Sequence, residues 1–362
     1  MIKILMLSSR SDRGGGPKHI AMLLELLGED YECFVAAPQS GCCFNVFARH
    51  SSAIMDLPYR RFSLMAFIKL CRFASKHEID IVHSHGRGAG YYARLMRMLS
   101  PPLKVVHTHH GFYYQRLRGA KRWILVAIEK ALSKLTHAFI FVSKSESEMA
   151  ASVSLFNVGK SYFIPNGVKL VSWVDRKHSA CKAKLIAVTR LEREKGNDIL
   201  IRVAAELVRL NKDFVLSVVG VGPDRVWLES LVAEFGLQAH VQFLGGRGDV
   251  SALLSRSDVF VSASFGEAHP LSVVEAMMHG VPVVVSRVLG HVDTIEAGRT
   301  GFMFEIDSPR TAAAHIANLM SDSALWQQLR RNAYEVAKAQ FEVERMVAET
   351  RAVYRRVLAA EA

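Results

Sequence analysis

The feature that most constrains the fold of this chain is a regular alternation of short apolar runs with longer stretches of helical periodicity. Such alternation is typical of parallel sheets covered by helices on both faces. In the first half, strands are predicted at residues 2–7, 31–36, 79–83, 104–108 and 138–142, and helices at 17–27, 63–76, 90–99 and 121–135. The pattern therefore predicts an α/β fold that begins with a doubly wound sheet.

The alternation starts again after a polar, turn-rich segment at 166–182. Strands are predicted at 183–188, 214–219, 241–244, 259–262 and 281–286, and helices at 196–209, 224–235, 250–256, 271–279, 310–321, 323–341 and 343–359. Because 362 residues are too many for one small core, we expect two domains, at 1–168 and 169–342, and a last helical segment at 343–362. Two such halves place a ligand between them, at the carboxyl ends of the strands.

Positive charge is concentrated in the first half of the chain. The net charge is +12, and residues 1–168 carry 22 Lys or Arg against 11 Asp or Glu, whereas the remainder is nearly neutral. This asymmetry favours an anionic partner for the first half, such as phospholipid headgroups, a phosphorylated substrate or nucleic acid. No nucleic-acid recognition motif accompanies the charge, so we expect no nucleic-acid partner.

The cysteines and the apolar runs indicate the cellular compartment in which the protein is expected. The five cysteines are odd in number and lack metal-ligand spacing, which favours a reduced, cytoplasmic protein. No run reaches the roughly 18 apolar residues of a spanning helix. The N-terminus has a short apolar run that indicates a buried strand and not a signal peptide.

The segment 265–285 carries the clearest chemical signal. Pro270 suits the first turn of a helix, so Glu267 would precede that helix and Glu275 would lie about one turn into it. The N–H groups of Leu271 and Ser272 would point to an anion. A phosphate at a helix N-terminus between two carboxylates that accept hydroxyl hydrogen bonds describes a nucleotide-sugar site.

Glu267-x7-Glu275, with Ala276-Met277 and Gly280-x-Pro282 after it, resembles the acidic signature of the GT4-like retaining glycosyltransferases (glycosyl transferases group 1) of the GT-B fold. Further motifs of this family follow one another in the right order along the chain. They are Gly14-Gly15-Gly16, Thr108-His109-His110-Gly111-Phe112, Ile164-Pro165-Asn166-Gly167-Val168, Thr189-Arg190-Leu191 with Lys195-Gly196, Val219-Gly220-x-Gly222-Pro223, Phe243-Leu244-Gly245 and Gly298-x-Thr300-Gly301-Phe302.

The resemblance implies roles for five side chains. Arg190 and Lys195 would hold the diphosphate and stabilise it as a leaving group without a metal. Glu275 would bind the ribose hydroxyls, and Glu267 the hydroxyls of the donor sugar, with front-face attack in place of a nucleophilic carboxylate. His110 would hydrogen-bond the transferred sugar.

It also implies how the backbone contributes. Gly15 and Gly16 would let a loop approach the diphosphate and the acceptor, although an ordinary strand-to-helix turn is the alternative. Gly245 would line the donor site together with Leu271 and Ser272. The last helix would cross back to the first of two Rossmann-like domains, which face each other across a cleft.

Several histidines that are close in sequence could in principle bind a metal. His83, His85, His107, His109 and His110 are close in sequence, but no cysteine or carboxylate joins them, so no metal is expected. His85 is a second candidate for the cleft, and His109 is expected to pack in the core.

Two other features leave alternatives open. His269 stands where the family has a bulky apolar or small residue, and it would either tune the choice of donor or be neutral. Two basic aromatic stretches, 60–76 and 113–123, predict docking on an anionic bilayer, with a core face and a solvated face as the alternative.

The combined prediction is a retaining, metal-independent glycosyltransferase. It would use a nucleotide diphosphate sugar, with UDP favoured, and a glycan or lipid-linked glycan acceptor in cell-envelope polysaccharide (lipopolysaccharide-type) synthesis. It would be peripheral at the cytoplasmic face of the inner membrane. The alternatives are an epimerase or phosphorylase of the same fold and a non-catalytic nucleotide-sugar-binding protein.

Overall fold

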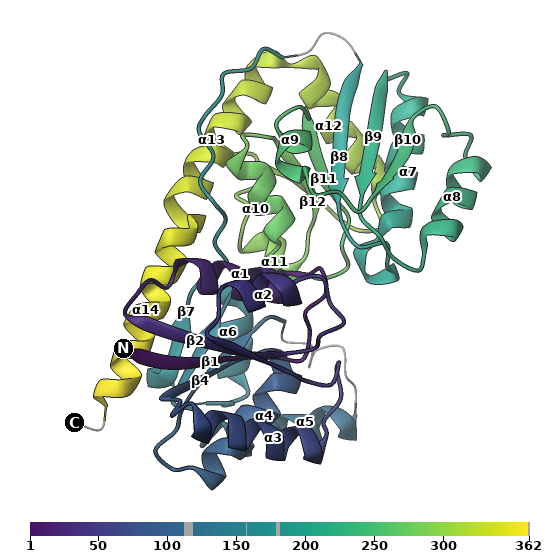
Figure 1. The fold of residues 1–362 in the computed structure, drawn as a ribbon. Helices are drawn as coiled ribbons and strands as arrows, with labels where there is room; N and C mark the ends of the chain where they lie inside the picture. The colour runs from purple at the N-terminus through teal and green to yellow at the C-terminus, as the bar shows by residue number, and fades with distance from the viewer. Residues whose placement is uncertain (112–118, 157, 179–181, 361–362) are drawn as a thin grey trace. The chain divides into compact units, whose positions relative to one another are not determined.

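The computed structural model describes residues 1–111, 119–156, 158–178 and 182–360. The chain divides into two compact units, and each is built on one parallel sheet (Figure 1). The first unit comprises Met1–Gly167 and Val343–Ala362, and the second comprises Val168–Glu342. The α/β fold with two doubly wound sheets is confirmed.

The first unit contains a seven-stranded sheet in the order β3-β2-β1-β4-β5-β6-β7, with every pair parallel. The strands are β1 (Ile2–Ser8), β2 (Tyr31–Ala37), β3 (Ala53–Asp56), β4 (Ile81–His85), β5 (Lys104–His109), β6 (Ala138–Phe141) and β7 (Ser161–Phe163). The helices are α1 (Gly15–Leu26), α2 (Phe44–Arg49), α3 (Leu64–Lys76), α4 (Gly86–Leu99), α5 (Ala120–Ser133), α6 (Lys144–Ser152) and, from the chain's end, α14 (Val343–Ala359).

The second unit repeats this architecture with six parallel strands in the order β10-β9-β8-β11-β12-β13. They are β8 (Ala183–Val188), β9 (Phe214–Val219), β10 (Val241–Gly245), β11 (Val259–Ser262), β12 (Val283–Ser286) and β13 (Gly301–Phe304). The helices are α7 (Asn197–Arg209), α8 (Arg225–Glu234), α9 (Val250–Leu254), α10 (Leu271–Met278), α11 (Leu289–Val292), α12 (Pro309–Ser321) and α13 (Ser323–Phe341).

Strand order reverses once in each sheet, and this reversal positions the functional residues. The first strand of each unit, β1 or β8, lies between the second and the fourth. Consecutive connections therefore leave the sheet in opposite directions at that point and open a crevice outside the carboxyl ends of the strands. Residues that follow β1, β4 and β5, or β8, β11 and β12, are consequently brought together.

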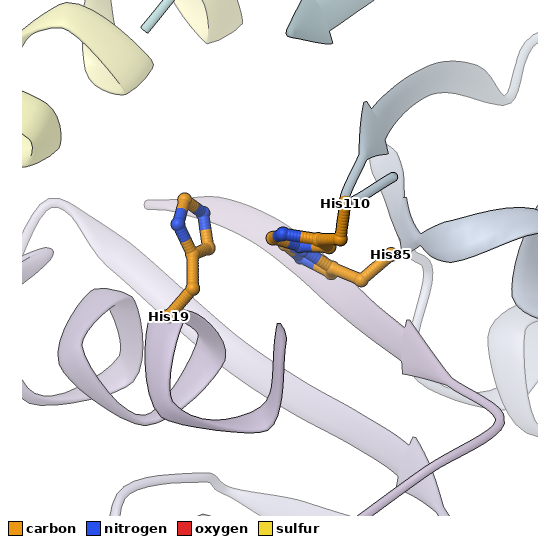
Figure 2. A group of neighbouring side chains, drawn as sticks. All are labelled: His19, His85 and His110. Atoms are coloured by element: carbon orange, nitrogen blue, oxygen red, sulfur yellow. The ribbon is translucent and has the colours of Figure 1, made fainter. Parts of the chain in front are cut away.

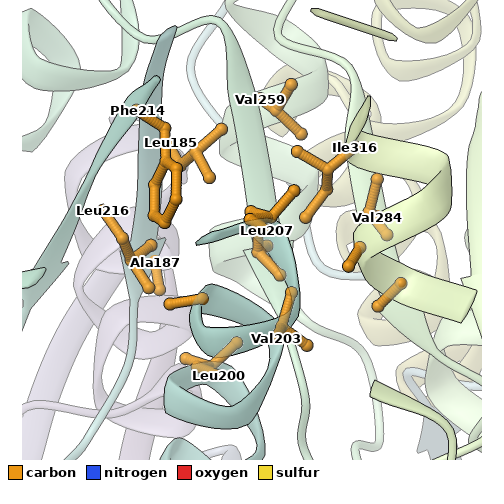
Figure 3. Packing of buried hydrophobic residues seen from close by; sticks show 14 of the residues in the cluster. Leu185, Ala187, Leu200, Val203, Leu207, Phe214, Leu216, Val259, Val284 and Ile316 are labelled. Carbon is orange, nitrogen blue, oxygen red and sulfur yellow. The ribbon is translucent and has the colours of Figure 1, made fainter. Parts of the chain in front are cut away.

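A dry apolar core fixes the second sheet to its helices. Figure 3 shows Leu200, Val203 and Leu207 of α7 packed toward side chains of β8 and β9, among them Phe214. Phe214 is fully buried, and burying a side chain of this size contributes about 1.5–3 kcal/mol. The core thus holds the carboxyl ends of the strands at fixed positions.

The last helix, α14, packs in the first unit against α1 and β5. Its buried Tyr354 hydroxyl lies 2.6 Å from Nδ1 of His83 on β4, and Nε2 of His83 lies 2.7 Å from the hydroxyl of Thr108. Arg351 donates to the carbonyl of Leu26 at the end of α1. These contacts connect the chain's end to the strands that carry the histidines.

A buried ion pair joins two helices of the first unit. Arg94 of α4 and Glu129 of α5 are 2.8 Å apart, with side chains that are almost fully buried. Arg94 also donates to the hydroxyl of Thr136.

The structure corrects several predicted boundaries. Strand β4 begins at Ile81 and not at 79, and β12 begins at Val283 and not at 281. Helix α1 begins at Gly15, two residues earlier than predicted. The short strands β3, β7 and β13 were not predicted. Among the described residues, no helix is both long and apolar enough to cross a bilayer.

Candidate functional site

The second unit gathers charged side chains at the carboxyl ends of β8 and β11. Arg190 and Lys195 follow β8, whereas Ser264 and Glu267 follow β11. Since these strands are neighbours at the reversal of strand order, their following loops meet.

Lys195 and Glu267 form the centre of this group. Nζ of Lys195 lies 2.6 Å from Oε1 of Glu267, and the hydroxyl of Ser264 donates to the same oxygen at 2.6 Å. Burial opposes ionisation of Glu267, but Lys195, the nearby His291 and the Ser264 hydrogen bond outweigh it and hold the pKa of the carboxyl below its ordinary value. Glu267 is therefore a fixed anion, and Lys195 retains two further N–H groups for a ligand.

Gly196 explains how Lys195 comes so close to β11. Its φ is +59°, and a Cβ at this position would lie only 2.0 Å from the carbonyl oxygen of Ala263. Any side chain would push the Lys195 turn away from the β11 loop. The Lys-Gly pair in the sequence thus has a steric reason.

Arg190 has a carboxylate partner that the sequence did not reveal. Its guanidinium lies 2.5 Å from Glu192, in a pair that is about one third exposed. The amide of the buried Asn197 donates to the Arg190 carbonyl and fixes the turn. Arg190 would have to exchange Glu192 for an anionic ligand.

Helix α10 supplies main-chain donors beside these residues. Pro270 is the N-cap and not, as predicted, a residue of the first turn. Val273 and Val274 make the first bonds back to the Pro270 carbonyl, so the N–H groups of Leu271 and Ser272 precede the hydrogen-bonded ladder. Such groups carry the partial positive charge of a helix N-terminus.

The remaining predicted donor-site residues lie on or next to α10, except Gly245, which lies at the end of β10. Glu275 is half-buried one turn into this helix. Gly245 ends β10 with a φ of +67°, and its carbonyl accepts from the N–H of Gly220. His269 is buried, and its ring packs edge-on against Phe341 at a centroid distance of 5.1 Å.

The sequence did not single out His291. It is buried at the end of α11, and its Nδ1 lies 2.7 Å from the carbonyl oxygen of Ser286. Its proximity lowers the pKa of Glu267, while burial lowers the pKa of His291 itself. A buried histidine after a strand was the available signal, but only the fold connects it to Glu267.

The first unit places three histidines at the carboxyl ends of its strands. His85 ends β4, His110 follows β5, and His19 lies in the second turn of α1. Nδ1 of His85 is 3.1 Å from Nε2 of His110, and Figure 2 shows His19 directed toward both. Gly15 and Gly16 are beside them, in the first turn of α1 and not in a loop as predicted.

Burial lowers the pKa of these histidines, for His19 to about 4 and for His85 and His110 well below the ordinary value. All three are neutral at pH 7, so each has a ring nitrogen with a free lone pair or an acceptor role. His109 instead stacks on Phe141 at 4.8 Å, as predicted for a packing residue.

Of the five histidines considered as metal ligands from the sequence, only two belong to a potential ligand set. Among the residues that the structure describes, His19, His85 and His110 offer atoms within 4.8 Å of one another. His83 instead bonds to Tyr354 and Thr108.

The structure describes the two basic aromatic stretches, 60–76 and 113–123, to different extents. In α3, Phe67 and Leu70 are buried, whereas Leu64, Met65 and Ile68 are exposed. The second stretch is described only from residue 119 onward, because 112–118 lie outside the described residues.

Comparisons with known proteins show which family the chain resembles. The family described as Glycosyltransferase Family 4 matches residues 13–171, and the family described as Glycosyl transferases group 1 matches residues 175–336. The Bacillus subtilis protein EpsD, assigned as a glycosyltransferase, is 26% identical over 90% of this chain and 89% of its own length. The Escherichia coli UDP-Gal:alpha-D-GlcNAc-diphosphoundecaprenol alpha-1,3-galactosyltransferase is 27% identical over 72% of each chain.

A solved structure supports the fold independently. Anabaena Alr3699/HepE in complex with UDP and glucose aligns with a TM-score of 0.84 at 18% identity, over 98% of this chain and all of that one.

Proposed function

This chain belongs to the GT4 family of glycosyltransferases, which has the GT-B fold, and we propose that it transfers a sugar from a UDP-sugar to a lipid-linked glycan with retention of configuration. The observation that carries the proposal is the ion pair of Lys195 and Glu267 at the carboxyl ends of β8 and β11, with Arg190 following β8 and the N-terminus of α10 following Glu267. These residues combine cations for a diphosphate with a carboxylate for hydroxyls.

The donor would bind the second unit through complementary charge. Arg190 and the two remaining N–H groups of Lys195 would contact the diphosphate, with the N–H groups of Leu271 and Ser272 beside it. As the bond to the sugar breaks, negative charge grows on the diphosphate, and fixed cations stabilise that change. Gly245 would line the same site.

The two carboxylates have separate tasks in this proposal. Glu275 would accept hydrogen bonds from the ribose. Glu267 would orient the donor sugar, and its ion pair with Lys195 would keep it charged. Attack would take place on the face from which the diphosphate leaves, so Glu267 forms no covalent bond.

We propose that the first unit receives the acceptor and the transferred sugar. His110 would hydrogen-bond the sugar as a neutral imidazole, in agreement with its lowered pKa. Gly15 and Gly16, in the first turn of α1, would contribute main-chain N–H groups.

We also propose that the protein is a cytoplasmic enzyme that binds reversibly to anionic membranes through α3. This helix exposes Leu64, Met65 and Ile68 and carries Lys69 and Arg72. Each cation near an anionic surface contributes about 1 kcal/mol. More protein should sediment with phosphatidylglycerol vesicles than with phosphatidylcholine vesicles. A Lys69→Glu/Arg72→Glu variant should sediment equally with both. Equal sedimentation of the wild-type protein with both kinds of vesicle would exclude membrane binding through α3.

The donor site is tested by thermal unfolding with UDP, GDP, ADP and dTDP, with and without Mg²⁺. A nucleotide at about 100 times its Kd adds roughly 2.7 kcal/mol of stability. We expect a shift with UDP that does not need Mg²⁺ and that is lost in Arg190→Ala and Glu275→Ala. Arg209→Ala, an exposed arginine of α7, is the matched control and should retain the shift.

The reaction is tested separately with UDP-sugars and diphosphoundecaprenol-linked acceptors. NMR of the product should show the anomeric configuration of the donor. An inverted product, or nucleotide shifts that survive in Arg190→Ala, would refute the proposed site.

A further inference from the structure

We infer that His19, His85 and His110 form a binding site for a divalent transition-metal ion of the Zn²⁺ type in the first unit, a site beyond the proposed transfer reaction. The three rings offer ligand atoms within 4.8 Å of one another from three separate elements, and Figure 2 shows them converging. Three histidines with one open position are a common ligand set of protein zinc sites.

The His85 and His110 rings already have a separation that suits a metal, and His19 would have to move closer to them, since the three ligand atoms lie within 4.8 Å of one another. The His85 and His110 nitrogens are 3.1 Å apart. Two Zn–N bonds of about 2.0–2.1 Å at a tetrahedral angle place their nitrogens about 3.3 Å apart. The metal would replace the proton that these two nitrogens share, and that proton would move to the opposite nitrogen of the ring or to solvent.

An unused nitrogen provides a second observation. Nε2 of His19 has no hydrogen-bond partner within the described structure, although the side chain is more than nine-tenths buried. Leaving a buried polar atom without a partner is unfavourable. A cation that binds the lone pair of this nitrogen would remove that cost.

The surroundings resemble those of an organised ligand set. Nδ1 of His19 lies 2.9 Å from Oδ1 of Asn166, which fixes the ring and leaves Nε2 as the ligand atom. Burial also keeps the three rings neutral, the state in which imidazole binds a metal. Imidazole donors favour Zn²⁺, Cu²⁺ and Ni²⁺ over Mg²⁺ or Ca²⁺.

The site predicts inhibition. His110 is proposed to bind the transferred sugar, and a ring nitrogen that ligates zinc is no longer available for it. Zn²⁺ would therefore inhibit transfer without changing UDP binding to the second unit. Removal of zinc by EDTA would restore activity.

The test uses the tag-free full-length protein. Isothermal titration with Zn²⁺ should give one site, and Co²⁺ should give the intense visible bands of a tetrahedral complex. His19→Gln and His85→Asn should each weaken Zn²⁺ binding at least tenfold, and Asn166→Ala by about tenfold through loss of ring orientation. His50→Ala, an exposed histidine of the same unit, should bind Zn²⁺ as the wild type does.

Melting curves without metal show whether each variant is folded. If His19→Gln or His85→Asn does not fold, the other of these two variants is used for the test. Weak octahedral Co²⁺ bands, absence of Zn²⁺ binding, or equal affinity in His19→Gln and wild type would overturn the site. UDP binding is measured in the same samples, so failure of the donor site is distinguished from failure of the metal site.

Discussion

Replacement of Lys195 by Met tests the central contact of the candidate site. The substitution keeps most of the side-chain length and removes only the charge. It leaves the Glu267 carboxylate in the same surroundings without its cation at 2.6 Å. We therefore expect a loss of stability in the second unit as well as a loss of donor binding.

The structure sets the magnitude. The two side chains are 17% and 18% exposed, so the pair is largely buried. Removing one partner of a buried pair costs about 3–5 kcal/mol, and the remaining exposure favours the lower end, about 3 kcal/mol. The double variant Lys195→Met/Glu267→Gln leaves no isolated charge, so it should be more stable than the sum of the single effects predicts, by about 2 kcal/mol.

Urea unfolding followed by tryptophan fluorescence is the assay. Trp173, Trp227 and Trp326 lie in the second unit, and the fourth tryptophan, Trp123, is exposed in the first. A Trp123→Phe background makes the signal specific to the second unit. With a slope of about 2–3 kcal/mol per M, a loss of 3 kcal/mol lowers the midpoint by about 1–1.5 M.

The pH dependence provides the decisive check. Because the pKa of Glu267 is lowered in the folded protein, its stabilisation is present above the unfolded pKa of about 4.3 and is lost as the pH falls through the folded value. Without Lys195, burial penalises the charged form, and protonation relieves the penalty. The difference between variant and wild type should thus shrink from pH 7 toward pH 4. Additive single effects within about 0.5 kcal/mol, or a difference independent of pH, would refute the reasoning.

Three further predictions concern the architecture around the sites. Gly196→Ala should destabilise the second unit by more than about 2 kcal/mol and abolish UDP binding, because its Cβ would meet the Ala263 carbonyl; calorimetry and titration measure both. Tyr354→Phe removes the hydroxyl partner of buried His83 and should cost about 1–3 kcal/mol in thermal unfolding. Arg94→Met leaves a buried carboxylate in the first unit and should cost about 3–5 kcal/mol, visible as a lower midpoint of thermal unfolding.

The sequence predicts elements best where they are buried on both faces. Strands β8, β9 and β11 have the predicted bounds, since runs of aliphatic residues end at polar turns. The missed strands β3, β7 and β13 have three or four residues each, and each lies at an end of its sheet. Such strands lack the continuous apolar run that identifies a central strand.

Whether a site residue could be predicted from the sequence depends on whether it belongs to a local motif. Those within local motifs, such as Lys195 and Glu267, could be singled out, although their direct contact depends on the packing of two strand ends. The residues His291 and His19 were missed because tertiary proximity has no local pattern, whereas Glu192 was missed although it lies only two residues after Arg190. For His19, the residue lies two positions beyond Pro17 in an apparently ordinary amphipathic helix, and only the strand order brings it to His85 and His110.

The side chains at the two strand-order reversals differ in charge: those of the second unit are charged, and the histidines of the first unit are neutral. This difference accounts for the separate roles that we propose for the two units. In the second unit the edge holds a cation, an anion and helix N–H groups whose charges remain fixed at neutral pH. Ion pairing within such a site offsets the cost of desolvating its charges. The fixed charges could then stabilise the negative charge that develops on a leaving diphosphate. In the first unit burial keeps the histidines neutral, so in the proposed reaction they would hydrogen-bond hydroxyls without competing for the diphosphate. The same neutrality that suits a sugar also makes these imidazoles ligands for zinc, so the proposed inhibition is a direct consequence of the chemistry that serves the substrate.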